Sequence, residues 1–254
     1  MEFLDLVIDD RIAHVRLNRG RSNAMNTTLI AELRGLLDQL DGDPVVSGML
    51  LHGKEGFFSS GLDLIELYGY DEQQVRQFWI DFIALVRRFV AFSKPSVAAI
   101  SGHSPAGGCV LAICCDYRVM AEGEFVIGLN ELPVGIVVPQ AIFHLYSFWI
   151  GQANAYRNLL EGRLMSPEEA LAMGLVDELS PKEGLVSRAE KQLRKYIELE
   201  PTTWKNSKLN LRKELINTFA GDQTEDIDAI LKQWWAPSTR SILKSIIDNL
   251  TAKK

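Results

Sequence analysis

Hydrophobic residues in the first half of the chain follow two alternating periods. Short apolar runs at residues 3–8 and 12–17, separated by the polar residues 9–11, predict an antiparallel hairpin. Residues 27–40 instead place leucine and isoleucine at helical spacing. Strand-like and helical segments continue to alternate as far as about residue 138. This alternation predicts an α/β fold with a mainly parallel sheet.

The pattern changes from Pro139 onward, where helical periods dominate. We expect a core with the candidate site at residues 1–195 and a C-terminal helical region at residues 196–254 that packs on itself or on another subunit. The further predicted strands are 45–51, 97–101, 117–120, 125–127 and 174–180, and the further predicted helices are 72–92, 106–114, 140–149, 153–160, 167–173, 185–199, 202–219, 225–234 and 238–250.

Composition narrows the class of protein. With 254 residues, 47% of them hydrophobic and 24% charged, the chain has the balance of a globular protein that buries a sizeable core. A net charge of −6 without a dense Lys/Arg run disfavours a nucleic-acid partner. We expect no membrane span, because no apolar run reaches about 20 residues. The start of the chain does not resemble a secretory signal, and the cysteines make a poor disulfide framework, so a cytoplasmic location is expected.

Two glycine-marked turns stand where a strand is expected to give way to a helix, at residues 57–64 and 100–109. The second helix is expected to begin at Gly107, which leaves free N–H groups and a positive dipole end at the turn. Such a turn stabilises negative charge, either a phosphate or a developing enolate. The alternative is that the glycines serve tight packing between strand and helix. Neither turn matches the P-loop or the G-x-G-x-x-G pattern.

Four blocks of sequence, in the order and spacing expected, resemble the crotonase family, the enoyl-CoA hydratase/isomerase superfamily. The resemblance runs from the N-terminal hairpin to Asp177. Beyond that residue only the helical character is similar. The blocks are Phe58-Ser59-Ser60-Gly61-Leu62-Asp63-Leu64, Gly102-His103-Ser104-Pro105-Ala106-Gly107-Gly108-Cys109, Cys115-Asp116-Tyr117-Arg118, and Ile127-Gly128-Leu129-Asn130-Glu131 with Gly135-Ile136.

The resemblance implies a superhelix of β-β-α units with a C-terminal helical region used in trimerisation. We therefore expect a homotrimer or a dimer of trimers. It also implies an acyl-CoA thioester as substrate and no separate cofactor. The backbone amides of Leu62 and Gly107 would donate to the thioester oxygen, each worth about 3 kcal/mol of barrier.

The resemblance further implies where coenzyme A binds. Backbone groups of two segments would hold the adenine: Ser22, Asn23 and Ala24 in the first, and Ser59, Ser60 and Gly61 in the second. Cations near the phosphates vary within the family. Arg19, Arg21 and Lys54 are the candidates here.

Two positions indicate which reaction of the family this chain performs. The hydratases use two glutamates, and the first falls at Val110, where no carboxylate can act. The second falls at Glu131. The apolar residues beside it are expected to desolvate its carboxyl group, namely Leu129, Leu132, Pro133 and Val134. A single glutamate suits a proton shuttle from C2 to C4, which converts a 3-enoyl-CoA to the 2-trans-enoyl-CoA of fatty-acid β-oxidation. The motifs resemble the mitochondrial-type Δ3,Δ2-enoyl-CoA isomerases. Weak hydration, thioester hydrolysis and non-catalytic acyl-CoA binding are the alternatives.

Other reactive side chains have structural interpretations. Ser104 misses the G-x-S-x-G nucleophile pattern. His103 could line the pocket beside the turn, and Trp79 and Phe82 are candidates for the acyl wall. The Asp116-Tyr117-Arg118 block is typical of a structural ion pair. No metal site is expected, because neither H-E-x-x-H nor C-x-x-C occurs.

Overall fold

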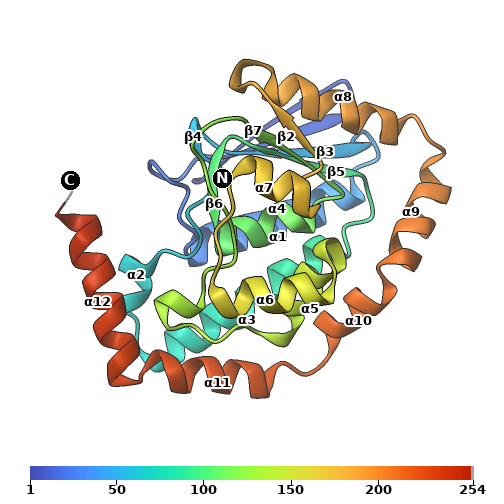
Figure 1. Ribbon diagram of the computed structural model, residues 1–254. Coiled ribbons are helices and arrows are strands. Elements are labelled where there is room, and N and C mark those ends of the chain that lie inside the picture. Colours follow the sequence, from blue (N-terminus) through green and yellow to red (C-terminus); the bar gives the residue numbers. More distant parts are fainter. Residues whose placement is uncertain (253–254) are drawn as a thin grey trace.

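Two sheets organise the first part of the computed structural model, which describes residues 1–252 (Figure 1). The larger sheet follows the order β1 (Leu4–Asp9), β2 (Ile12–Leu17), β3 (Gly48–His52), β5 (Ser96–Ile100), β7 (Tyr117–Ala121) and β9 (Glu178–Ser180), and the smaller one the order β4 (Gly56–Phe57), β6 (Gly102–Pro105) and β8 (Ile127–Gly128). In the larger sheet β1 pairs antiparallel with β2, which confirms the predicted hairpin, and the other pairs are parallel.

Helices follow these strands in a regular succession. The helices are α1 (Thr27–Gly42), α2 (Leu64–Tyr68), α3 (Glu72–Val90), α4 (Gly107–Cys114), α5 (Gln140–Ile150), α6 (Gln152–Glu161), α7 (Pro167–Met173), α8 (Leu185–Ile197), α9 (Pro201–Leu211), α10 (Lys213–Ala220), α11 (Thr224–Trp234) and α12 (Pro237–Thr251), with 3-10 turns η1 (Leu132–Val134) and η2 (Lys182–Gly184). A strand of the large sheet, a short strand of the small sheet and a helix recur as β3-β4-α3, β5-β6-α4 and β7-β8-α5, with the short α2 and η1 inserted in the first and third, which confirms the expected β-β-α units.

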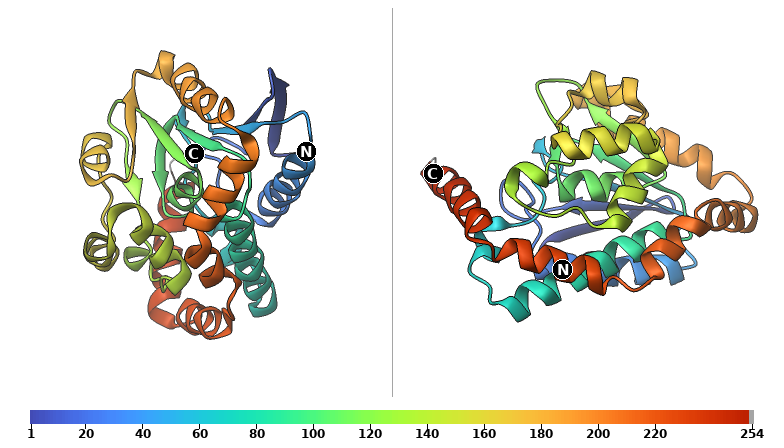
Figure 2. Two further views of the ribbon diagram at one scale, coloured as in Figure 1. Left: turned by 90° about the vertical axis from the view of Figure 1, so that its right-hand side faces the viewer. Right: turned by 60° about the horizontal axis from the view of Figure 1, so that its bottom comes forward.

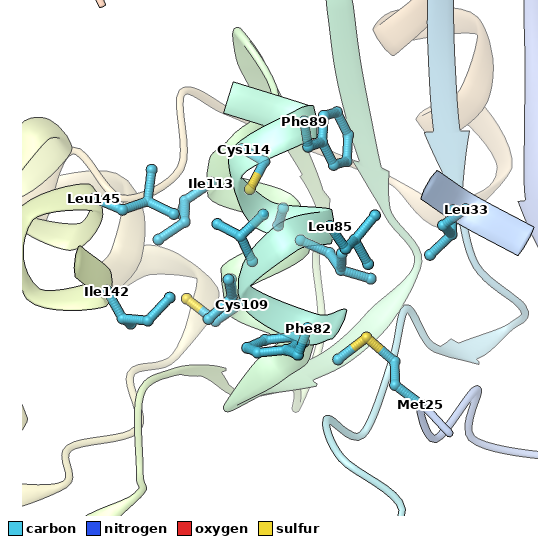
Figure 3. Close-up of a cluster of buried hydrophobic side chains, with 14 of the residues drawn as sticks. Met25, Leu33, Phe82, Leu85, Phe89, Cys109, Ile113, Cys114, Ile142 and Leu145 are labelled. Atoms are coloured by element: carbon cyan, nitrogen blue, oxygen red, sulfur yellow. The ribbon is translucent and has the colours of Figure 1, made fainter. Parts of the chain in front are cut away.

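The central strands β3, β5 and β7 of the large sheet are buried on both faces, which explains their continuous apolar runs. Leu50 belongs to the hydrophobic cluster that includes α8, whereas its neighbour Leu51 belongs to the main cluster around α1, α3 and α4. Figure 3 shows side chains of α4 such as Cys109 and Ile113 between Phe82 of α3 and Ile142 of α5. Helix α4 is therefore completely buried, and its first residues are held at a fixed place.

The C-terminal helices form an arc around this body (Figures 1 and 2). The expected boundary at residue 195 lies inside α8, which packs on β3, β5 and β7. The prediction of one helix over 202–219 is wrong, because α9 ends at Leu211 and α10 begins at Lys213. Residues 253 and 254, part of the expected C-terminal region, lie outside the described residues.

The break between α9 and α10 coincides with a buried ion-pair network. The guanidinium of Arg212 is 4% exposed and donates to the Cys114 carbonyl at 2.9 Å. It also pairs with Asp116 at 3.1 Å, and Lys208 donates to the same carboxylate at 2.7 Å. These two cations hold the pKa of Asp116 below its usual range despite burial. The structural interpretation of Asp116 is confirmed, although both of its cationic partners come from the C-terminal helices.

No helix within residues 1–252 is both long and apolar enough to cross a bilayer.

Candidate active site

The two glycine-marked turns meet at the ends of β4 and β6. Gly61 has φ +87°, and a Cβ placed on it would lie 3.1 Å from the Gly107 nitrogen. A Cβ on Gly107 would lie 2.3 Å from Cε of Met25 and 3.3 Å from Cδ2 of Leu62. The flexible end of Met25 can shift, but the added Cβ would also lie 3.4 Å from the Gly61 Cα, so the two turns pack closely at Gly107.

The backbone amides of Leu62 and Gly107 remain available as donors in this arrangement. Within residues 1–252, neither N–H donates a hydrogen bond to a protein acceptor. Gly107 is the first residue of α4, where N–H groups have no partner inside the helix and the dipole is positive. Two unpaired donors on adjoining turns are the arrangement that stabilises an oxyanion.

Ala106, directly before α4, adopts a strained conformation that the sequence did not reveal. Its φ is +49° and its ψ −124°, a region that residues with a Cβ rarely occupy. The Ala106 N–H donates to the Gly128 carbonyl at 2.8 Å, which ties the turn to β8. Such strain persists where the surroundings fix the backbone, and it is frequent at functional sites.

A cavity of about 100 Å³ opens beside these amides. Leu62, Gly107, Val110 and Glu131 all contribute to its wall, so the structure brings the three candidate catalytic residues together. Trp79 and Phe82, the candidates for the acyl wall, also line it, and both pack in the main hydrophobic cluster. The remaining lining residues are Ser60, Leu64, Pro105, Ala106, Asn130, Val134, Ile136, Pro139 and Ile142, of which the last three carried no sequence signal for this role.

Glu131 lies between β8 and η1 and is nearly enclosed. Its carboxyl Oε2 is buried without a hydrogen-bond partner in the described part of the chain, and the residue is 9% exposed. Burial raises the pKa of Glu131 to about 7, partly offset by a hydrogen bond from its own backbone amide. A carboxylate with this pKa can both accept and return a proton near neutral pH.

The apolar surroundings of Glu131 differ in part from the expectation. Leu129 is 1% exposed and Val134 lines the cavity, but Leu132 is 39% exposed and Pro133 is also exposed. The prediction that Leu132 and Pro133 desolvate Glu131 is therefore wrong. Apolar residues of other elements, including Phe82 and Val110, line the same cavity instead.

The raised pKa of Glu131 makes stability depend on pH. Because the value is about 7 in the fold against an ordinary 4.5, the folded chain holds the proton more tightly, and stability falls as pH rises through this window. Glutamine does not titrate, so Glu131→Gln should not lose stability for this reason. The free energy of unfolding of the variant minus that of the wild type should therefore rise by on the order of 3 kcal/mol from about pH 4 to about pH 8. Urea unfolding at both pH values measures it, and a pH-independent difference would contradict a buried ionised carboxylate.

The two segments expected to hold adenine lie side by side. The Ser60 N–H donates to the Ser22 carbonyl at 2.8 Å, and the Asn23 side chain donates to the Phe58 carbonyl at 3.0 Å. Asn23 and Ser59 are fully buried, so their side chains support the turn and face no ligand. Contacts to coenzyme A from Ser22, Asn23, Ala24, Ser59, Ser60 and Gly61 remain a prediction.

The candidate cations differ in their partners. Arg19 pairs with Asp63 at 2.7 Å and with Glu66 at 2.9 Å, so its charge is already neutralised by carboxylates of the protein. Lys54 donates to the Gly20 carbonyl at 2.7 Å, and Arg21 is exposed. Arg21 thus remains the candidate with the most accessible charge.

Other groups near the turns do not enter the cavity. His103 accepts from the Val126 N–H at 3.2 Å and packs on Phe57 and Phe125, so it does not line the pocket. Ser104 and the three cysteines are fully buried, and burial raises the pKa of Cys115 to about 12. Within residues 1–252, no cluster of His, Cys, Asp and Glu side chains is suited to hold a metal.

The chain resembles known proteins in both sequence and fold. The chain matches the family described as Enoyl-CoA hydratase/isomerase over residues 8–233. It is 34% identical over 245 residues to Enoyl-CoA delta isomerase 1, mitochondrial, of Mus musculus, across 96% of this chain and 85% of that protein. It is 30% identical over 205 residues to a Probable enoyl-CoA hydratase of Bacillus subtilis (strain 168), across 80% and 79%. The crystal structure of human mitochondrial delta3-delta2-enoyl-CoA isomerase aligns with a TM-score of 0.95 at 28% identity, across 99% of both chains.

Proposed function

Since this chain belongs to the enoyl-CoA hydratase/isomerase family, we propose that it converts 3-enoyl-CoA to 2-trans-enoyl-CoA in fatty-acid β-oxidation. One observation supports this choice above the others. Among the described residues that line the cavity, Glu131 is the one ionisable side chain. A reaction that needs one acid–base group fits such a cavity better than a reaction that needs two.

The proposed steps use groups that share this cavity. The thioester oxygen accepts hydrogen bonds from the Leu62 and Gly107 amides, which stabilise the charge that develops there. The Glu131 carboxylate removes a proton from C2, and the electron pair of that C–H bond enters a dienolate. Protonated Glu131 then returns the proton to C4, and the double bond moves from C3–C4 to C2–C3. The reaction needs neither water nor an oxidant, and Glu131 is regenerated.

Hydration is the second candidate, and the relative of B. subtilis named a probable enoyl-CoA hydratase favours it. Concerted addition of water uses two acid–base groups in the family pattern. At the first of these positions the cavity wall is Val110, which is 1% exposed and cannot hold or polarise water. Hydration would therefore be slow.

A single assay separates the candidates. The protein is incubated separately with 3-cis-enoyl-CoA, 2-trans-enoyl-CoA and a saturated acyl-CoA, and conjugation, hydration and thiol release are followed. We expect conjugation of the first substrate and little change in the others. Hydration of the 2-trans-enoyl-CoA as the dominant activity would favour the second candidate, thiol release a hydrolase, and binding without turnover an acyl-CoA binding protein.

Assembly and location remain proposals of the same kind. The resemblance to trimeric members suggests a homotrimer or a dimer of trimers, which the native mass in solution would test. The cytoplasmic location expected from the sequence also stays a prediction, since the relative of Mus musculus is named mitochondrial.

A further inference from the structure

The last helix, α12, contacts both halves of the candidate site. It packs against α2, which begins two residues after Leu62, and against η1, which begins directly after Glu131. Figure 1 shows α12 beside α2 at the end of the C-terminal arc. These contacts connect a helix distant in sequence to the segments that carry the oxyanion donor and the base.

The contact with α2 is made by Arg240. Its guanidinium carbon lies 3.4 Å from the ring centroid of Tyr68, the last residue of α2, and 4.9 Å from that of Trp235. Its Nη2 donates to the Tyr68 carbonyl at 2.9 Å. Stacking and a charge-assisted hydrogen bond on one residue fix the end of α2 more firmly than either contact alone.

The contact with the Glu131 turn is made by the preceding residue, Thr239. It is fully buried, and its hydroxyl donates to the Gly135 carbonyl at 3.3 Å while it accepts from Gln233 at 2.7 Å. A Cβ on Gly135 would lie 2.9 Å from this hydroxyl oxygen, so the Thr239 side chain packs directly on the backbone of Gly135. Gly135 ends η1, and the next N–H, of Ile136, donates to the Glu131 carbonyl at 3.0 Å.

The attachment of α12 depends on few residues. It begins at Pro237 after an extended residue, Ala236, which separates it from α11. Among the described residues of α12, Thr239 and Leu243 are the buried ones. The second half of the helix therefore adds little to its position, and Thr239 and Arg240 provide its polar contacts with the site.

We propose that Thr239 and Arg240 are positioning residues that set the Leu62 amide and the Glu131 carboxylate at their working separation. The inference rests on the proposed isomerase function, because it assigns these residues to the geometry of that reaction. Arg240 holds α2 behind the oxyanion donor, and Thr239 holds the turn behind the base. Neither residue lines the catalytic cavity, so both act through the segments they contact.

Arg240→Met tests the first contact, because methionine keeps an unbranched stem and removes the guanidinium with its charge and donors. A displacement of about 1 Å in a catalytic group can cost about 100-fold, so we expect kcat for 3-enoyl-CoA to fall about tenfold or more. KM should change less than about threefold, because the cavity itself is intact. Arg240→Lys, which keeps a donor for the Tyr68 carbonyl, should recover part of kcat.

Lys244→Met is the matched control. Lys244 is a cation one turn further along α12, 65% exposed, and its partner is Asp248 on the same helix. It should leave kcat unchanged. An equal loss of kcat in this control, or wild-type kcat in Arg240→Met, would overturn the role of Arg240.

Thr239→Val and Thr239→Ser test the second contact, since valine keeps the shape and serine keeps the hydroxyl. Valine should lower kcat and serine should not. The losses of Thr239→Val and Arg240→Met should combine less than multiplicatively, because both act through α12. Fully multiplicative losses would contradict a single shared element.

Hydrogen exchange separates this inference from the proposed function. Absence of turnover in the wild type would contradict the isomerase assignment alone. Faster amide exchange in both 62–68 and 131–136 of Arg240→Met, with no increase in Lys244→Met, would support the positioning role of Thr239 and Arg240 whichever reaction the protein catalyses. Exchange that increases in 62–68 alone would contradict it.

Discussion

Replacing Glu131 with glutamine is expected to lower kcat for 3-enoyl-CoA by about 10²–10⁴-fold, the usual contribution of a general base. Glutamine keeps the shape of the side chain but cannot accept the C2 proton. No other ionisable side chain among the described residues lines the cavity to replace it. Binding of a saturated acyl-CoA should remain close to wild type, because the amides of Leu62 and Gly107 are untouched.

The measurement compares steady-state kinetics and calorimetric binding of the two proteins. Glu124→Gln is the matched control, since Glu124 is exposed and lies outside the cavity. It should retain full activity. Turnover by Glu131→Gln at the wild-type rate would remove Glu131 from the mechanism and with it the proton shuttle.

Substituting Gly107 with alanine is expected to lower kcat by about 10²–10³-fold, the typical effect of losing one oxyanion donor. The added Cβ would lie 2.3 Å from Cε of Met25 and 3.3 Å from Cδ2 of Leu62. The methionine end can move, but the added Cβ would also lie 3.4 Å from the Cα of Gly61, the residue before the other proposed donor. We expect relief of these contacts to shift the turns that carry the two amides relative to the thioester oxygen.

Gly35→Ala gives the comparison for a harmless glycine replacement. Gly35 is an exposed residue within α1, and nothing lies within 4 Å of its added Cβ. This control should keep its activity and gain about 0.5–1 kcal/mol of stability, because alanine favours a helix. Retention of wild-type kcat by Gly107→Ala, with an unchanged fold, would show that the two amides do not act as an oxyanion hole.

Short-range features were predictable from sequence because their causes are local. Asn26 accepts from the Leu29 N–H at 3.0 Å and starts α1, and Asp63 caps α2 in the same way. Pro167 opens α7 at the predicted residue. A periodic pattern and a capping side chain depend on neighbours three or four residues away, so both can be seen in a single sequence.

Long-range partners were not predictable in this way. The break at Arg212 depends on carbonyls and a carboxylate near residues 114–116, about a hundred positions earlier. Arg19 was a candidate for binding phosphate, yet Asp63 and Glu66 fold against it. Leu132 and Pro133 were expected to enclose Glu131 because they follow it in sequence, but their side chains face outward.

The sequence by itself determined the α/β class, the two glycine-marked turns and the identities of Val110 and Glu131, because residue type and local period carry that information. Only the tertiary structure brought Leu62, Gly107 and Glu131 to one cavity and placed α12 behind both halves of it. It also decided that Glu131 has a pKa of about 7. Desolvation depends on everything packed around a carboxyl group, and those atoms come from segments that approach one another only when the chain has folded.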